Sequence, residues 1–298
     1  MSGDASHDVR VRLARKAREM GADFALVLVR YGVERLLYRL SRSSHADQFI
    51  LKGSSLFLVW KGQSFRVTRD VDFLGYGEPD AERIRIVFED VASQHGGDDG
   101  LVFLRETVVA EPIRESQEYD GIRVTMVATL GKARIPVQID IGFGDSVVPG
   151  AESVDFPSVI DQPMARLRAY SRYSFVSEKV EAMVKLGIAN SRMKDFYDLC
   201  LVSRMFEFEW ALLHGAVEGT FARRRTPLPV KPPIALTVTF WSDPSKESQW
   251  RGFLKKSSPV EQMGALRDVG GEVARFVLPL FGLDAGHEPV RWIPSRGW

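Results

Sequence analysis

The stretch LKGSSLFLVWKGQSFRVTRDVDFL, residues 51–74, combines a Gly-Ser pair, an apolar run and two aspartates one residue apart. Side chains of an extended strand alternate between its faces, so Asp70 and Asp72 are expected to project from one side while Val71 and Phe73 point into the core. Two carboxylates this close repel each other unless a hard divalent cation such as Mg²⁺ lies between them. The stretch therefore predicts a strand that carries a metal site.

Upstream of the aspartates, Gly53 and Ser54 follow a short apolar strand over residues 48–51. Ser54 is expected to cap a helix over residues 55–61, because its hydroxyl can accept a free backbone N–H of the first turn. A helix start of this kind also offers N–H groups and a hydroxyl to a phosphate. Beside a metal held by the aspartates, it suits a nucleoside triphosphate bound as its Mg²⁺ complex. Each feature also has an ordinary explanation when taken singly: Gly53-Ser54 as a common helix cap, and Asp70 and Asp72 as a surface strand end.

In-line nucleotidyl transfer also needs a third carboxylate, which holds a second metal and helps to deprotonate the incoming hydroxyl. Asp140 is the candidate, because it lies between isoleucines on a predicted strand, where burying an unpaired carboxylate would be costly. The alternative is that Asp140 caps a turn at Gly142. The position of Asp140 on a predicted strand thus makes it a third predicted metal ligand, beside Asp70 and Asp72.

The remaining pattern predicts an α/β (α+β) fold with a mixed sheet in the first half of the chain. Apolar residues recur at helical spacing over residues 9–18, 22–40 and 79–94, which predicts three helices. The first two carry arginines on their other faces, and the third begins at a proline. Period-two alternation predicts three strands, over residues 101–111, 121–130 and 134–143. A tight turn at Gly131 and Lys132 indicates that the second and third of these strands form an antiparallel hairpin.

The amino-acid composition changes after Phe143, where a connection rich in Pro, Gly, Ser and Asp precedes a mainly helical region. The expected helices span residues 177–189, 192–205, 210–222 and 259–276. We place a domain boundary near residue 165. This predicts one domain over 1–165 and a helical domain over 166–298 that completes an active-site cleft.

Composition restricts the class of protein. The 298 residues are 45% hydrophobic and 27% charged with a formal net charge of +1, which is typical of a globular protein rather than a globally basic nucleic-acid clamp. Basic clusters, Arg12 to Arg18 and Arg223 to Arg225, either contact phosphates or are solvated faces. With Cys200 as the single cysteine, no signal peptide and no apolar run long enough for a membrane span, we expect a cytoplasmic protein. The histidines lack the spacing of a zinc site.

Four short motifs carry a resemblance to a known family. Gly53-Ser54 followed by Asp70 and Asp72 is similar to the signature of the polymerase-β-like nucleotidyltransferase superfamily. RVTRDVD, residues 66–72, resembles the Arg-x-Ser/Thr-x-Asp-x-Asp form of AbiEii-type toxins, including the MenT-like nucleotidyltransferases. YSRYSFVSEK, residues 170–179, and RMKDFYDL, residues 192–199, resemble two further segments of that family. The matches run from about Lys52 to Leu199.

The resemblance implies a role for each matched residue. Gly53 and Ser54 would bind the triphosphate, Asp70 and Asp72 would be catalytic ligands of Mg²⁺, and Arg66 would contact the nucleotide. Lys179 would meet the nucleotide phosphates and Asp195 would be a catalytic or orienting carboxylate. Arg192 and Lys194 would also bind the nucleotide. The alternative for the second group is structural: a surface ion-pair ladder of Glu181 and Lys185 on one helix, and a charged start of the next helix.

The resemblance also implies a function, namely the toxin of a toxin–antitoxin pair that transfers NMP from an NTP to an acceptor hydroxyl, most notably at the tRNA 3′ end. Its partners would be the NTP, the tRNA and a cognate antitoxin. Two alternatives remain open: modification of a small molecule or a protein side chain, and NTP binding without transfer. Ser177 stands where the family has alanine, and the Tyr170–Phe175 run lacks the usual proline or acid, which bears on substrate contacts more than on metal chemistry.

Overall fold

The computed structural model describes residues 2–66, 70–113, 121–283 and 290–298. The chain divides into two compact units. Unit 1 comprises Met1–Ser64, Thr68–Gly144 and Glu152–Ala169, and unit 2 comprises Phe65–Val67, Asp145–Ala151 and Tyr170–Trp298. Two short segments of the first half of the chain therefore belong to unit 2, in addition to the helical region that the sequence pattern places there.

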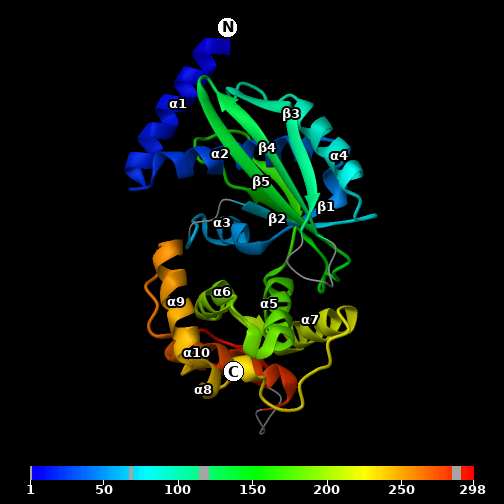
Figure 1. The fold of residues 1–298 in the computed structure, drawn as a ribbon, viewed down its shortest axis with the longest axis vertical. Helices are drawn as coiled ribbons and strands as arrows, with labels where there is room; N and C mark the ends of the chain where they lie inside the picture. Colours follow the sequence, from blue (N-terminus) through cyan, green and yellow to red (C-terminus); the bar gives the residue numbers. More distant parts are fainter. Residues whose placement is uncertain (1, 67–69, 114–120, 284–289) are drawn as a thin grey trace. The chain divides into compact units, whose positions relative to one another are not determined.

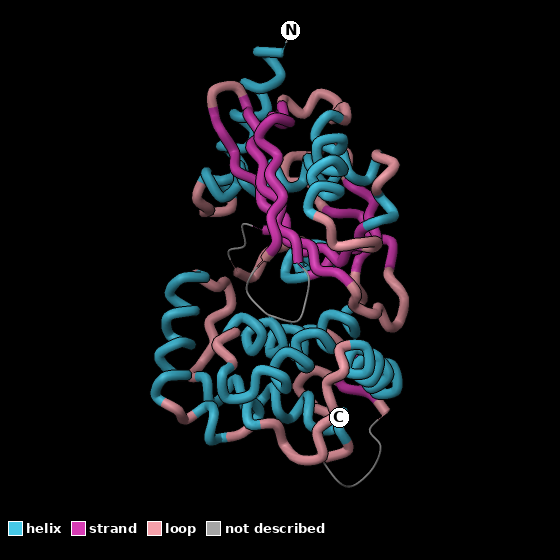
Figure 2. The backbone as a smooth tube through the Cα atoms, turned by 45° about the vertical axis from the view of Figure 1, so that its right-hand side comes forward, coloured by secondary structure: helices cyan, strands magenta, loops and turns pink. Residues whose placement is uncertain are grey.

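Unit 1 is built on a seven-stranded mixed sheet in the order β3-β4-β5-β2-β1-β7-β6 (Figure 1). The pairs β2–β5 and β1–β7 are parallel, and the other neighbours are antiparallel. The strands are β1 (Phe49–Lys52), β2 (Asp70–Gly75), β3 (Leu101–Pro112), β4 (Gly121–Leu130), β5 (Ala133–Phe143), β6 (Glu152–Phe156) and β7 (Ala165–Ala169). The predicted hairpin is confirmed, since β4 and β5 pair in antiparallel register from Gly121 with Gly142 to Leu130 with Ala133, as the long strands in Figure 2 show.

Helices of unit 1 pack on this sheet. They are α1 (Ser2–Glu19), α2 (Phe24–Arg42), α3 (Leu56–Lys61), α4 (Ala81–Ser93) and the short 3₁₀ turns η1 (Ala46–Gln48) and η2 (Gly53–Ser55). Helix α2 packs against β5 and β7, while α4 packs against β3 and β4. The side chain of Asp23 caps α2 by accepting a bond from Leu26 N, and Asp80 caps α4 in the same way.

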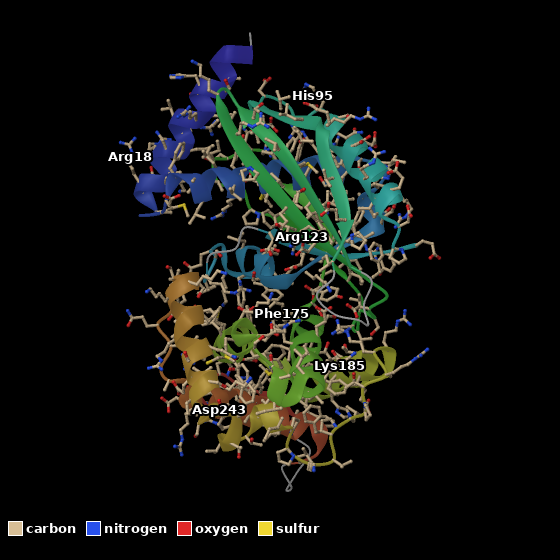
Figure 3. All side chains as sticks on the ribbon, in the orientation of Figure 1. Arg18, His95, Arg123, Phe175, Lys185 and Asp243 are labelled. Carbon is tan, nitrogen blue, oxygen red and sulfur yellow. The ribbon has the colours of Figure 1, made fainter. Side chains whose placement is uncertain are left out.

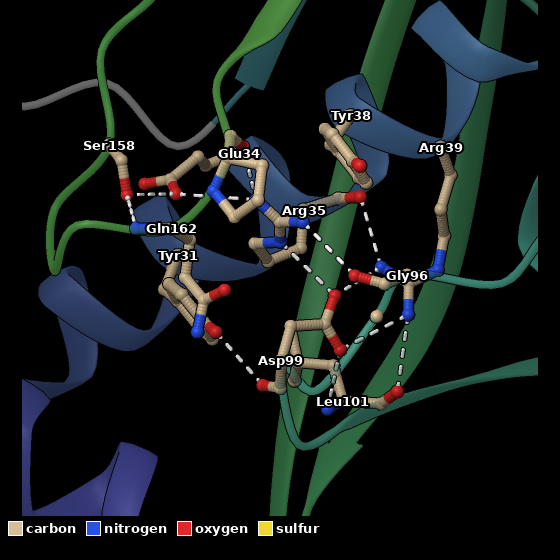
Figure 4. A network of polar contacts seen from close by, with 12 residues as sticks. Tyr31, Glu34, Arg35, Tyr38, Arg39, Gly96, Asp99, Leu101, Ser158 and Gln162 are labelled. Atoms are coloured by element: carbon tan, nitrogen blue, oxygen red, sulfur yellow. Dashed lines mark hydrogen bonds and ion pairs between the residues drawn. The ribbon is translucent and has the colours of Figure 1, made fainter.

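The arginines on the second helix are not all solvated, because Arg35 and Arg39 are buried around a buried carboxylate (Figure 4). Asp99 Oδ2 accepts bonds from Arg35 Nε at 3.1 Å and from Arg39 Nη1 at 2.6 Å. Arg35 also donates to the carbonyl oxygens of Pro163 and Gly96 at 2.7 and 3.2 Å. This network fixes the loop before β3 and the segment before β7 to α2, because each guanidinium satisfies several acceptors at once.

Unit 2 is helical. It contains α5 (Arg172–Leu186), η3 (Gly187–Ala189), α6 (Met193–Met205), α7 (Trp210–Arg223), η4 (Ile234–Leu236), α8 (Val238–Trp241), α9 (Pro244–Ser257), α10 (Leu266–Val277), η5 (Leu278–Phe281) and the two-stranded pair β8 (Phe208–Glu209) and β9 (Arg291–Trp292). Its core includes a cluster of aromatic rings in which Phe276 stacks on Trp298 and lies against Trp292.

Several predicted elements differ from the structure. The helix expected over 177–189 begins at Arg172, because Ser171 caps it by accepting a bond from Ser174 N. The helix expected over 259–276 is shorter, as α10, and α9 precedes it. Strands β6 and β7, which lie in and after the connection that follows Phe143, were not predicted. None of the described helices combines the length and the hydropathy that crossing a membrane requires.

Candidate active site

The acidic part of the site lies on strand β2. Asp70 and Asp72 are partly exposed, whereas Val71 and Phe73 between and after them are buried, so the two carboxylates share one face of the sheet. Strand β2 is held on both sides, by four paired residues of β1 and six of β5. The alternation expected from the sequence is therefore present, and the sheet fixes the face from which both aspartates project.

Gly53 leaves open the space that the Asp72 carboxylate occupies. Its φ of +73° is in the left-handed region, and a Cβ at this position would lie 2.0 Å from Asp72 Oδ2 and 2.8 Å from Cγ. Ser54 follows in the turn η2 and is 8% exposed. The Gly-Ser pair and Asp72 are thus brought together, because only glycine combines this backbone conformation with so close an approach.

The expected capping role of Ser54 is wrong. Residues 53–55 form the 3₁₀ turn η2, and α3 begins only at Leu56 without a side-chain cap. The Ser55 hydroxyl instead donates to the carbonyl oxygen of Lys52 at 3.2 Å. The glycine conformation at the turn accounts for the difference, because it places the chain in a tighter turn before the helix starts.

Asp140 lies opposite Asp72 on the neighbouring strand and forms an ion pair. It is the register partner of Asp72 across the parallel pair β2–β5 and of Arg123 across the hairpin. The Arg123 guanidinium, labelled in Figure 3, donates from Nε and Nη2 to the two oxygens of Asp140, both at 2.8 Å. The turn cap suggested as an alternative for Asp140 is therefore not its environment, since Asp140 lies inside β5.

The acidic face can hold a metal with two protein ligands. Among the described residues, no group of three or more His, Cys, Asp or Glu side chains is arranged to bind a metal ion. Mg²⁺ is commonly bound by only one or two carboxylates, with water and substrate phosphates as its other ligands. Asp70 and Asp72 therefore fit this ion on donor chemistry, whereas Asp140 as a further ligand remains a prediction.

The second group of predicted residues lies in unit 2, around the buried ammonium of Lys179 on α5. Lys179 Nζ donates to Asp195 Oδ1 and to Asp198 Oδ2, both at 2.8 Å, and lies 4.7 Å from the centre of the Phe175 ring. Both carboxylates are on α6 and are 0% exposed. Lys179 therefore forms ion pairs with two buried carboxylates of α6. A row of surface ion pairs along α5 alone would not include them.

Electrostatics keeps this cluster ionised. Burial lowers the pKa of Lys179, but the charges of Asp195 and Asp198 outweigh it and the pKa lies above its ordinary value. For Asp195, burial raises the pKa, but Lys179 and Arg192 hold it well below its usual range. The pKa of Asp198 is likewise lowered, against burial, by Lys179 and Arg66. Asp195 is therefore a poor proton acceptor near neutral pH, which favours an orienting role over that of a general base.

The predicted nucleotide contacts in unit 2 divide into buried and exposed groups. Arg66 forms a bidentate pair with Asp198, with Nε and Nη2 at 3.0 and 3.1 Å from the two oxygens. Arg192 donates from Nε to Asp195 Oδ2 at 2.6 Å, and its side chain is 45% exposed. Lys194 is exposed on the first turn of α6. Arg192 and Lys194 can therefore meet a ligand, whereas the guanidinium of Arg66 is directed at Asp198.

Arg224 organises the other side of α5. It donates to both oxygens of Asp145 at 2.8 and 2.9 Å, to Glu178 Oε1 at 2.9 Å and to Glu181 Oε2 at 2.7 Å. Glu181 also accepts a bond from the Thr226 hydroxyl. The Glu181 carboxylate is therefore a buried group held by Arg224 and Thr226, and not only a member of a surface row along α5. Arg224 is an internal group rather than a member of a solvated basic cluster.

The N-terminal basic cluster is engaged mainly along its own helix. Arg15 and Lys16 lie 3.6 and 3.5 Å from the carboxylate of Glu19, and Arg12 lies 3.9 Å from Asp8. These are intrahelical pairs one turn apart, each of which contributes little to stability. Arg12 is half-buried and also donates from Nη2 to the carbonyl oxygen of Ile160.

Two residues of the site were not assigned a role from the sequence, although a signal was present for each. Counting equal numbers of residues outward from the predicted turn at Gly131 and Lys132 pairs Arg123 with Asp140, as the hairpin shows. Asp198 lies three residues after Asp195 and so shares its helix face. Its pairing with Arg66 had no local signal, because the two residues are far apart in sequence.

Comparison with known proteins finds a matching family model and solved structures of similar fold. The sequence model of the family described as nucleotidyl transferase AbiEii toxin, type IV toxin–antitoxin system, matches residues 35–269. MenT4, a nucleotidyltransferase toxin from Mycobacterium tuberculosis, superposes with a TM-score of 0.52 at 15% identity, over 89% of each chain. JHP933 from Helicobacter pylori superposes with a TM-score of 0.50 at 12% identity, over 88% of this chain and 93% of that one. No curated protein matches the sequence.

Proposed function

Because the chain belongs to the AbiEii family of nucleotidyl transferase toxins of type IV toxin–antitoxin systems, we propose that it transfers a nucleoside monophosphate from an NTP to an acceptor hydroxyl and releases pyrophosphate. The family implies an NTP substrate and an antitoxin partner. The proposal concerns the reaction, the metal, the acceptor and the residues that act on them.

One observation carries the proposed chemistry. The Asp72 carboxylate lies over the α-carbon of Gly53, on the sheet face that it shares with Asp70. Asp70 and Asp72 would hold Mg²⁺, and the adjacent Ser54 would contact the triphosphate. When bound, Mg²⁺ neutralises charge on the phosphates as the bond to the leaving pyrophosphate breaks.

On the family resemblance, the Lys179 cluster would contact nucleotide phosphates. Two carboxylates keep Lys179 charged, and its ammonium would donate a hydrogen bond to a phosphate oxygen. Asp195, whose oxygens accept bonds from Lys179 and Arg192, would orient both cations. The exposed Arg192 and Lys194 would add contacts to the nucleotide.

We assign the tRNA 3′ end as the acceptor on the resemblance to MenT-like toxins. To test this, the purified protein is incubated with total RNA, Mg²⁺ and each of the four α-³²P-labelled NTPs in turn. Label in the tRNA band supports the proposal. Label on protein or on a small molecule would contradict tRNA as the acceptor and identify another one. NTP binding without any transfer would contradict the proposed reaction.

Asp72→Asn is the matched variant for this assay. It keeps the shape of the side chain and removes one negative charge from the metal site, so we expect transfer to be lost while the circular dichroism spectrum and melting temperature stay close to those of the unchanged protein. Full transfer by this variant would contradict the assignment of the metal site.

A further inference from the structure

Four charged side chains stand in one row across four strands of the sheet in unit 1. Lys52 on β1 is the register partner of Asp72 on β2, Asp72 is the partner of Asp140 on β5, and Asp140 is the partner of Arg123 on β4. Register partners project from the same face of a sheet. The row therefore reads cation, carboxylate, carboxylate, cation, and its charges balance.

The Lys52 ammonium lies over this face. A Cβ built on Gly142 of β5 would lie 3.4 Å from Lys52 Nζ, although β2 runs between β1 and β5. Gly142 is two residues after Asp140, so its substituent position is on the same face as Asp140. The long Lys52 side chain thus extends across β2, on the side from which Asp72 projects.

The two cations of the row differ in the chemistry of their side chains. The planar guanidinium of Arg123 is fixed to both oxygens of Asp140 by parallel bonds of 2.8 Å. Lysine carries a compact charge on a flexible stem and can redirect it. Of the two, Lys52 is therefore the cation that can leave the carboxylate row.

We propose that Lys52 is the counter-cation of Asp72 in the metal-free protein, competes there with the divalent cation, and turns to the nucleotide triphosphate once that cation is bound. The proposal rests on the proposed function and gives Lys52 two successive roles, first as the counter-cation of Asp72 and then as a contact to the triphosphate. Lys52 immediately precedes the Gly53-Ser54 turn, so a small rotation of its side chain leaves the strand pairing intact.

This role predicts effects of opposite sign on two ligands. Lys52→Met keeps the length and apolar stem of the side chain and removes the charge. Removing a nearby positive charge should tighten Mn²⁺ binding to the nucleotide-free protein by roughly threefold to tenfold, because like charges in a partly buried site repel. The same change should weaken binding of each Mg–NTP complex that the unchanged protein binds, by about tenfold, through loss of a charge-assisted phosphate contact.

Two control variants make the experiment specific. Lys132→Met removes the same charge from the exposed β4–β5 turn of the same unit, and should leave both affinities within twofold of those of the unchanged protein. Lys52→Arg keeps the charge and should bind Mn²⁺ as the unchanged protein does. Mn²⁺ binding is measured by electron paramagnetic resonance without nucleotide, and Mg–NTP binding by calorimetry with ATP, GTP, CTP and UTP separately.

The outcomes separate this inference from the proposed function. Tighter Mn²⁺ binding by Lys52→Met alone supports the counter-cation role, even if the unchanged protein binds Mn²⁺ too weakly to measure. Mn²⁺ binding by Lys52→Met that is unchanged, absent or weaker overturns that role, as does tightening in Lys52→Arg. If no nucleotide binds to the unchanged protein, the proposed function fails while the Mn²⁺ measurement still decides the role of Lys52.

Discussion

Replacing Gly53 with alanine tests whether the position of the Asp72 carboxylate depends on the open space at Gly53. The new methyl group would lie 2.0 Å from Oδ2, 2.8 Å from Cγ and 3.0 Å from Cβ of Asp72. Non-bonded atoms do not approach this closely, so the carboxylate must leave its place. The φ of +73° adds a backbone cost of roughly 1–2 kcal/mol for a residue with a Cβ.

Gly62→Ala separates these two effects. Gly62 ends α3 with a φ of +71°, nearly the same as that of Gly53, but a Cβ there meets nothing within 4 Å. Both variants should therefore lose similar stability from the backbone. Only Gly53→Ala should displace a predicted metal ligand.

We expect Gly53→Ala to bind Mn²⁺ at least tenfold more weakly than Gly62→Ala. Displacing Asp72 removes a charged contact to the metal, and even a hydrogen bond to a charged group contributes about 1.5–3 kcal/mol, where 1.4 kcal/mol is a factor of ten. Nucleotide transfer should fall in parallel. Electron paramagnetic resonance with Mn²⁺ and urea unfolding midpoints provide the two measurements. Equal Mn²⁺ affinity in the two alanine variants would refute the reasoning, because metal binding would then not depend on the position of the Asp72 carboxylate beside Gly53.

Two further predictions concern the cluster in unit 2. Lys179→Met leaves Asp195 and Asp198 with one cation each, Arg192 and Arg66, and should cost about 1.5–3 kcal/mol at pH 7 through the lost charge-assisted bonds; an unchanged urea midpoint would contradict the ion pairs. In the unchanged protein the pKa values of both carboxylates are depressed, so the stability that they contribute is complete above about pH 4 and is lost only as pH falls through the lower folded values. In the variant both pKa values should be less depressed, so this stability should be lost at higher pH. Asp198→Asn should raise the KM for NTP more than it lowers kcat, because Arg66 and Lys179 both lose an anchor; in a double-mutant cycle, Arg66→Lys should then add little further effect, and full additivity would argue against the pairing.

Local patterns were sufficient for the elements that hold the acidic face. The alternation of Asp70, Val71, Asp72 and Phe73 predicts which side chains are accessible, and the strand has that pattern. The turn at Gly131 predicts a hairpin, and its register follows from the turn. These features depend on residues close in sequence, where the side-chain period of a strand is decisive.

Long-range pairing could not be predicted in the same way. Arg66 and Asp198 are 132 residues apart, and nothing near either residue identifies the other. Arg35 reads as one more arginine on a polar helix face until Asp99 is placed beside it. Buried ion pairs follow from tertiary packing, and a charge pattern alone does not distinguish them from solvated groups.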